Sequence, residues 1–185
     1  MSDGGAVRAM QRLFVALDLP AAAVAAVEAW QRTQLERRTG LRVSPSLHLT
    51  LAFLGDTDRG LVPAIAERLT SISWAPIATR LAPPLFLPAK GSKRVVALGL
   101  EDAGGRLAGL RRQVVQALAA DGVYAPEKRP WLPHITVARF RLPGQPFDLQ
   151  NVNIAEFRVV RMVLYSSQLE HAGAVHTPLA VFPAS

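Results

Sequence analysis

Apolar and polar residues alternate in short blocks along this chain, and the blocks predict strands separated by helices and turns. Strands are expected where aliphatic and aromatic residues gather between turn residues, namely over 12–19, 47–54, 77–87, 95–100, 134–138, 156–166 and 175–182. Helices are expected where apolar residues recur with helical spacing, namely over 20–38, 60–71 and 105–120. Antiparallel hairpins and the lack of a glycine-rich loop after the first strand indicate an α+β fold rather than a doubly wound parallel sheet.

One short pattern occurs twice. His-Leu-Thr-Leu-Ala at 48–52 is followed eighty-six positions later by His-Ile-Thr-Val-Ala at 134–138. Residues two apart in a strand project from the same face, so each His shares a face with its Thr while the aliphatic residues point to a core. An internal duplication that forms two similar lobes explains the repeat. Two copies of a polar face suggest one site made of two halves.

Length and composition narrow the protein class. At 185 residues, half of them hydrophobic, the chain is expected to form a single two-lobed domain over 1–185, with a flexible N-terminus over 1–11. It has no run of about 18 apolar residues and no signal-peptide pattern at its start, so we expect a cytoplasmic monomer without a membrane segment. The absence of cysteine excludes disulfides and thiolate metal sites.

The net charge of +7 comes from eighteen Arg and only three Lys. Planar guanidinium groups favour bidentate binding of phosphate, so a polyanionic partner is expected, although an arginine-rich proteome would give the same composition.

Several segments beyond the two motifs resemble the two-histidine phosphoesterase superfamily, and within it the bacterial RNA 2′,3′-cyclic phosphodiesterases, also called the 2′-5′ RNA ligase family. These segments are 12–20, 47–55, 129–139, 164–167 and 177–179, so the resemblance covers nearly the whole chain. It implies a bilobal, pseudo-twofold fold in which two antiparallel sheets with outer helices face each other across a central groove. It also implies that His48 is the proton donor to the 3′ oxygen and that His134 is the proton acceptor that activates water.

The activity that this resemblance implies, the opening of a cyclic phosphodiester by water, suits paired histidines. The reaction needs a base for the water proton, an acid for the leaving oxygen, and donors for the phosphoryl oxygens. Imidazole titrates near neutrality, so one ring can be neutral while the other is charged. Thr50 and Thr136 would donate hydrogen bonds to the non-bridging oxygens, and no metal or cofactor is then required. A zinc site is a weaker interpretation, because each copy offers one good ligand.

Four further residues are candidates for a place at the groove. Arg139 stands where the family often carries Arg and could bind phosphate, but strand parity places it on the opposite face from His134 unless a bulge re-aims it. Arg129 is a candidate for contacting the RNA backbone and Phe14 for stacking on a base. His176 stands where the family usually has Tyr, and we expect it near the groove without a catalytic role.

Three functions remain open from the sequence. The first is metal-independent hydrolysis of RNA 2′,3′-cyclic phosphate ends to a 2′-phosphate, with reversible 2′-5′ RNA ligation as a further activity. The second is hydrolysis of a small cyclic phosphate derived from a nucleoside or from ADP-ribose. The third is a binding module for RNA or a nucleotide without turnover. An open basic groove would favour RNA and a closed pocket the small molecule, while two intact His and Thr pairs argue against a pure binder.

Overall fold

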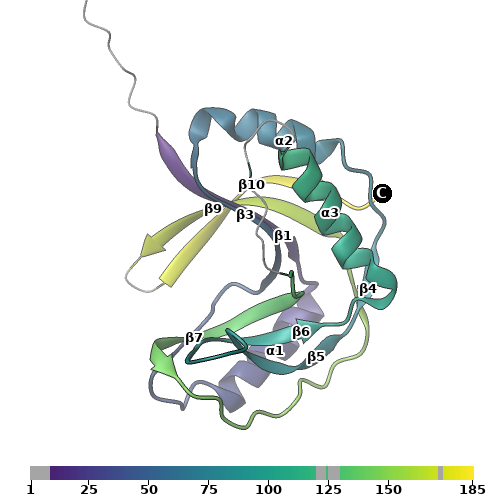
Figure 1. Cartoon of the computed structure of the whole chain (residues 1–185). Coiled ribbons are helices and arrows are strands. Elements are labelled where there is room, and N and C mark those ends of the chain that lie inside the picture. The colour runs from purple at the N-terminus through teal and green to yellow at the C-terminus, as the bar shows by residue number, and fades with distance from the viewer. Residues whose placement is uncertain (1–8, 120–123, 125–129, 171–172) are drawn as a thin grey trace, which may run out of the picture.

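The computed structural model describes residues 9–119, 124, 130–170 and 173–185, and these residues form an α+β fold (Figure 1). Within them, the α-helices are α1 (Ala21–Gln34), α2 (Val62–Thr70) and α3 (Arg106–Ala119). The strands are β1 (Met10–Asp18), β2 (Leu41–Val43), β3 (His48–Asp58), β4 (Ile77–Thr79), β5 (Leu81–Leu87), β6 (Lys93–Leu100), β7 (His134–Gly144), β8 (Phe157–Val159), β9 (Arg161–Glu170) and β10 (Gly173–Pro183). No helix in this part of the chain is both long and apolar enough to cross a bilayer.

Eight of the strands form one antiparallel sheet in the order β10-β9-β1-β3-β7-β6-β5, with β2 paired to β7. Its two halves, β10-β9-β1-β3 and β7-β6-β5 with β2, lie above and below one another in Figure 1. They join where β3 meets β7 at a single register pair, Leu49 with Ile135. The expected two sheets are therefore two halves of one sheet, because the residues that follow the two motif histidines pair directly.

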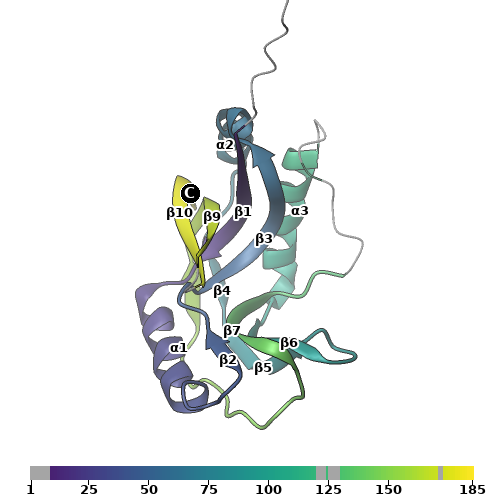
Figure 2. The same ribbon diagram turned by 90° about the vertical axis from the view of Figure 1, so that its left-hand side faces the viewer.

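The helices pack on the sheet through apolar side chains that line one side of each helix. α3 buries Leu107, Leu110, Val114 and Leu118, which are spaced three or four residues apart and so share one side of the helix. α3 contacts β3 and α2, and α2 contacts β10. Figure 2 shows α1 at the opposite end of the molecule from α2. α1 ends at Gln34, four residues before the predicted end, and the chain then turns into β2.

Two predicted strands each divide into a pair. The segment 77–87 forms β4 and β5, and the segment 156–166 forms β8 and the start of β9. β4 and β8 pair with each other as a separate two-stranded ribbon, whereas β5 and β9 join the large sheet. A single residue, Arg80 or Val160, separates the members of each pair. Apolar residues recur on both sides of each break, so hydrophobic periodicity gave no signal of the change of sheet.

The N-terminal strand begins earlier than predicted. Met10 and Gln11 pair with Asp58 and Thr57, so these two residues are not part of a flexible terminus. Their partners exist because β3 continues past Gly55, where the sequence predicted its end. Gly55 has a φ of 71° and lies beside an irregularity in the pairing, so the glycine allows a bulge there instead of ending the strand.

Candidate active site

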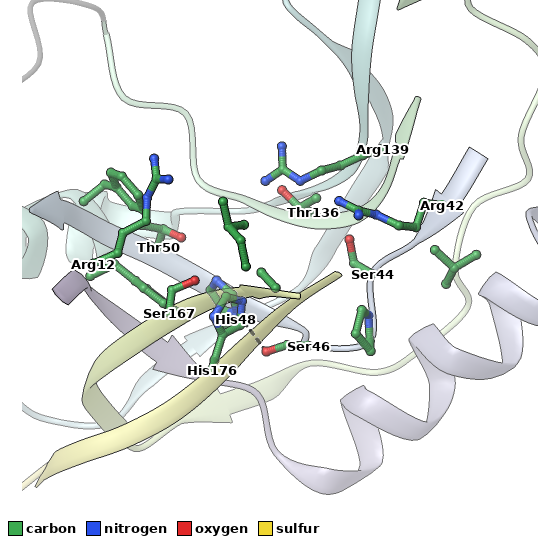
Figure 3. Close-up of a pocket in the computed structure, with 16 residues that line it drawn as sticks. Arg12, Arg42, Ser44, Ser46, His48, Thr50, Thr136, Arg139, Ser167 and His176 are labelled. Atoms are coloured by element: carbon green, nitrogen blue, oxygen red, sulfur yellow. Dashed lines mark hydrogen bonds between the residues drawn. The ribbon is translucent and has the colours of Figure 1, made fainter. Parts of the chain in front are cut away.

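A cavity of about 410 Å³ is lined by strands from both halves of the sheet (Figure 3). Its lining includes most of the residues predicted from the sequence, namely Phe14, His48, Thr50, Thr136 and Arg139. The sequence analysis did not single out several other lining residues, among them Arg12, Arg42, Ser44, Ser46, Phe53 and Ser167. Among the described residues, three arginines and no acidic side chain line this cavity, so its charge suits a phosphate group.

Two predicted residues need separate mention. Arg129 lies outside the described residues. His134 is not in the lining, although it begins β7 two residues before Thr136 and so projects from the same face. Its charge lowers the pKa of His48, so the two motif histidines lie close enough to interact electrostatically. His134 thus lies at the margin of the site, while His48 lies inside it.

The predicted alternation along the motif strands is confirmed. In β3, His48 and Thr50 are half-buried while Leu49 and Leu51 are buried in the core. β7 repeats this pattern, and the first seven residues of the two strands have the same sequence of buried, half-buried and exposed positions. Each strand therefore turns an apolar side to the core and a polar side outward, as alternate residues of a strand must.

Both motif strands also carry a bulge at the same place. The pairing of β1 with β3 passes from Val15–Ala52 to Ala16–Thr50 and leaves Leu51 as an extra residue. The pairing of β6 with β7 passes from Val96–Ala138 to Ala97–Thr136 and leaves Val137 as an extra residue. An extra residue reverses the parity of the positions that follow it.

The bulges decide which residue reaches the cavity at the fifth position after each histidine. On strict alternation this residue would face away from the site. Beyond the bulges, Phe53 of β3 and Arg139 of β7 both line the cavity. The parity argument against Arg139 is thus overturned by the bulge, and the equivalent position in the first copy could have identified Phe53.

A side chain from a helix supports each bulge. Arg111 of α3 donates its Nε–H to the carbonyl oxygen of Leu51 at 3.1 Å. Gln31 of α1 donates its Nε2–H to the carbonyl oxygen of Val137 at 2.8 Å and to that of Ser44 at 3.1 Å. α1 follows β1 in the chain and α3 follows β6, so the helix of each half supports the bulge of the other half.

His48 is enclosed by aromatic rings. The centroid of its ring lies 4.9 Å from that of Phe14 and 5.3 Å from that of His176, which stands edge-on to it. Its Nδ1 lies 3.3 Å from the hydroxyl oxygen of Ser46. Burial, followed by the positive charges of His176, Arg139 and His134, lowers the pKa of His48 to about 4. His48 is therefore neutral at pH 7 in the free protein.

His134 has a different partner. Its Nδ1–H donates to the carbonyl oxygen of Leu132 at 2.8 Å. A carbonyl only accepts hydrogen bonds, so Nδ1 must carry the proton. In the neutral ring the lone pair is then on Nε2, where it can accept a proton.

Phe14 is a buried residue whose ring packs against that of His48. Its side chain is 2% exposed, and its ring stacks on Tyr165 at 5.2 Å and contacts the edge of His176 at 4.9 Å. The Tyr165 hydroxyl donates to Asp18 at 2.7 Å; burial and this hydrogen bond raise the pKa of Tyr165. Because other rings surround Phe14, it supports His48 instead of offering a free face to a base.

Phe53 offers the exposed ring that Phe14 lacks. Its side chain is 42% exposed, and the Arg12 guanidinium lies 5.0 Å from the ring centroid. An aromatic ring beside an arginine is a suitable platform for a nucleobase. The expectation that His176 lies near the groove is confirmed, since it lines the same cavity. Within the described part of the chain, no three potential ligands from His, Cys, Asp and Glu gather where a metal ion would need them.

Known proteins are similar to this chain in sequence and in architecture. The sequence profile of the 2'-5' RNA ligase superfamily matches residues 19–169. The RNA 2',3'-cyclic phosphodiesterase of Escherichia coli strain K12 is 32% identical over 176 residues, which are 91% of this chain and 94% of that protein. A protein of the same name from Geobacillus stearothermophilus is 32% identical over 143 residues, which are 74% of this chain but 45% of that protein. The crystal structure of E. coli LigT complexed with 3'-AMP matches with a TM-score of 0.82 at 26% identity, and the match covers 96% of this chain and 99% of that chain.

Proposed function

Because the chain belongs to the 2'-5' RNA ligase superfamily, we propose that it hydrolyses RNA 2′,3′-cyclic phosphate ends to 2′-phosphates, with His48 and His134 as the proton-transfer pair and no metal ion. The observation that carries this proposal is the convergence of His48, Thr50, Thr136 and Arg139 from two strands on one basic cavity. A cyclic phosphate in that cavity would meet donors from both halves of the sheet.

His134 is the general base in this proposal. Its hydrogen bond to the Leu132 carbonyl leaves the Nε2 lone pair of the neutral ring free to take a proton from water. The water oxygen then bonds to phosphorus as the bond from phosphorus to the 3′ oxygen breaks. The product keeps its phosphate on the 2′ oxygen.

His48 is the general acid, and it must gain a proton before it can give one to the leaving 3′ oxygen. In the free protein its pKa of about 4 keeps it neutral, because of burial and the nearby positive charges. A bound phosphate brings negative charge between His48 and Arg139 and so raises the pKa of His48. The Ser46 oxygen, 3.3 Å from Nδ1, can accept a hydrogen bond from the charged ring. Substrate binding would therefore prepare the acid.

The remaining lining residues stabilise and position the substrate. The hydroxyls of Thr50 and Thr136 and the guanidinium of Arg139 would donate to the non-bridging oxygens as charge builds on them in the pentacoordinate state. Phe53 with Arg12 would hold the terminal base. In 2′-5′ ligation the 5′-hydroxyl of a second RNA would replace water: His134 would take its proton, its oxygen would bond to phosphorus, and the 3′ oxygen would leave with the proton from His48.

A bilobal, pseudo-twofold organisation belongs to the same proposal. Val-Ala-Leu occurs at 15–17 in β1 and again at 96–98 in β6, and each copy pairs with its motif strand in the same register. The bulges and their supporting helices repeat as well. These repeated features support an internal duplication with one His-x-Thr motif in each half. The monomeric state and the cytoplasmic location stay predictions.

Turnover of an oligoribonucleotide with a 2′,3′-cyclic phosphate end, measured in EDTA, tests the function. His48→Ala and His134→Ala should each lower kcat about 10²- to 10⁴-fold, the usual range for loss of a general acid or base. Thr70→Ala, on the outer helix α2, serves as a control and should leave kcat unchanged. Unimpaired turnover in either histidine variant would overturn the mechanism, and a 3′-phosphate product would overturn the assignment of acid and base.

A further inference from the structure

A second cavity, of about 600 Å³, lies beside β2 at the outer end of β7. Three arginines, Arg37, Arg38 and Arg141, share its lining with the apolar side chains of Leu41, Phe140 and Phe147. No acidic side chain lines it among the described residues. We call this cavity the β2 basic site. Its combination of guanidinium groups with aromatic and aliphatic surface is the one that single-stranded nucleic acids favour.

The three arginines of the β2 basic site are held differently. Arg38 donates to the carbonyl oxygens of Gln34 at 2.9 Å and Asp148 at 3.1 Å, and its guanidinium lies 4.0 Å from the Phe147 ring centroid. Arg38 is therefore a fixed part of the wall. The side chains of Arg37 and Arg141 are exposed, and within the described residues no hydrogen bond or ion pair holds them. These two guanidinium groups are available for an anion.

The β2 basic site is next to the candidate active site. β2 pairs with β7 through Leu41–Phe140 and Arg42–Arg139, which are neighbouring register pairs. Arg42 and Arg139 line the active-site cavity, whereas Leu41 and Phe140 line the β2 basic site. β2 is only three residues long, and among the described strands it pairs with β7 alone, so no other described strand covers its second edge. The short strand β2, about 10 Å long at 3.3 Å per residue, thus contributes residues to both cavities.

We propose that the β2 basic site binds the body of an RNA chain on the 5′ side of the cyclic phosphate, with Arg37 and Arg141 contacting its phosphates. This inference rests on the proposed function and deepens it. A cyclic phosphate terminates the 3′ end of an RNA, so the rest of the chain must leave the active site, and a chain that passed over β2 beside Arg42 would reach this cavity. A small nucleoside cyclic phosphate has no upstream phosphates and gains nothing from Arg37 or Arg141. The surface therefore selects oligonucleotides over small cyclic nucleotides.

The test compares two substrates that share the reacting end. One is a nucleoside 2′,3′-cyclic phosphate, and the other is a ten-nucleotide RNA that ends in the same nucleoside cyclic phosphate. In the double variant Arg37→Ala, Arg141→Ala, the KM for the RNA should rise about fivefold to tenfold and the salt dependence of binding should weaken by about 0.7 per lost contact in log–log slope. The kinetics on the small substrate should not change.

Arg112→Ala is the matched control, because Arg112 is also an exposed arginine but lies on α3. It should leave the KM for the RNA at its native value. An unchanged KM in the double variant, an equal loss on both substrates, or an equal loss in the control would each overturn the inference.

A failure of the proposed reaction can be distinguished from a failure of the β2 basic site. Affinity for a ten-nucleotide RNA with a 2′-phosphate end, measured by fluorescence anisotropy, requires no turnover. If the native protein hydrolyses neither substrate but loses affinity for this RNA in the double variant alone, the β2 basic site stands while the proposed reaction fails. If affinity does not depend on Arg37 and Arg141, the β2 basic site is rejected whatever the enzymatic result.

Discussion

The two motif strands begin with the same burial pattern and the same bulge but have very different surroundings. Each places a His, a Thr, a bulge and a fifth residue at matching positions. His48 of β3 lies among aromatic rings, whereas His134 of β7 lies at the cavity margin and donates a hydrogen bond to a main-chain carbonyl. The fifth residue is an aromatic ring, Phe53, in one strand and a guanidinium, Arg139, in the other. The repeated strand geometry determines where the motif side chains project, and the neighbouring side chains give each motif a different role.

The largest effect should separate the acid from the base. A phosphodiester with a p-nitrophenolate leaving group needs no protonation of that group. On this substrate, His48→Ala should recover most of the 10²- to 10⁴-fold loss in kcat seen with RNA, whereas His134→Ala should stay impaired. Release of p-nitrophenolate, followed by its absorbance, measures the difference. Recovery in the His134 variant alone would reverse the two roles.

Acid should destabilise the protein through His48. Its pKa is about 4 in the folded protein and about 6.5 in the unfolded chain, so below pH 6.5 the unfolded chain binds the proton that the folded protein excludes. The stability present above pH 6.5 is then lost as the pH falls toward 4, by at most about 3 kcal/mol. Urea unfolding at pH 7 and pH 4.5 measures this loss. His48→Leu should show a smaller loss; an identical loss would contradict the burial of a neutral ring.

The fifth residues offer a way to test the division between the strands. Arg139→Leu should lower kcat about 100-fold, because Arg139 meets charge that develops on the phosphate in the transition state. Phe53→Leu should mainly raise KM, by about tenfold, because it removes a stacking surface that the substrate uses throughout. Steady-state kinetics on the ten-nucleotide RNA distinguishes the two patterns. If both variants lowered kcat without changing KM, Phe53 and Arg139 would both act on the transition state, and the proposed division between the strands would be wrong.

The smallest effect should come from the supports of the bulges. Gln31→Leu should lower the free energy of unfolding by about 1–2 kcal/mol, because it removes donors from two main-chain carbonyls in a buried position. Arg111→Leu should cost about 1 kcal/mol, since Arg111 supplies one such hydrogen bond and is less buried. Urea denaturation measures both, and Gln113→Leu, on the exposed side of α3, is the control. Kinetic losses that mimic Arg139→Leu in the Gln31 variant would show that the support of the β7 bulge places Arg139.

The sequence predicted the parts of this molecule that depend on local pattern. The α+β class, the three helices and the outward faces of His48 and Thr50 follow from periodicity and turn residues. The pairing of Leu49 with Ile135 could not be predicted, because it joins strands far apart in the chain and depends on the whole sheet. The bulges were also hidden, since Leu51 and Val137 look like ordinary core residues. That is why Phe53 was missed and why Arg139 seemed to face the wrong way.

The crossed support of the bulges links the two halves of the sheet during folding. The carbonyl of Leu51 receives its donor from α3, and the carbonyl of Val137 receives one from Gln31 of α1. Each bulge is therefore complete only when the helix of the other half has packed against it. We expect the two halves to fold and unfold as one cooperative unit, so that the two histidines reach their working positions in the same step.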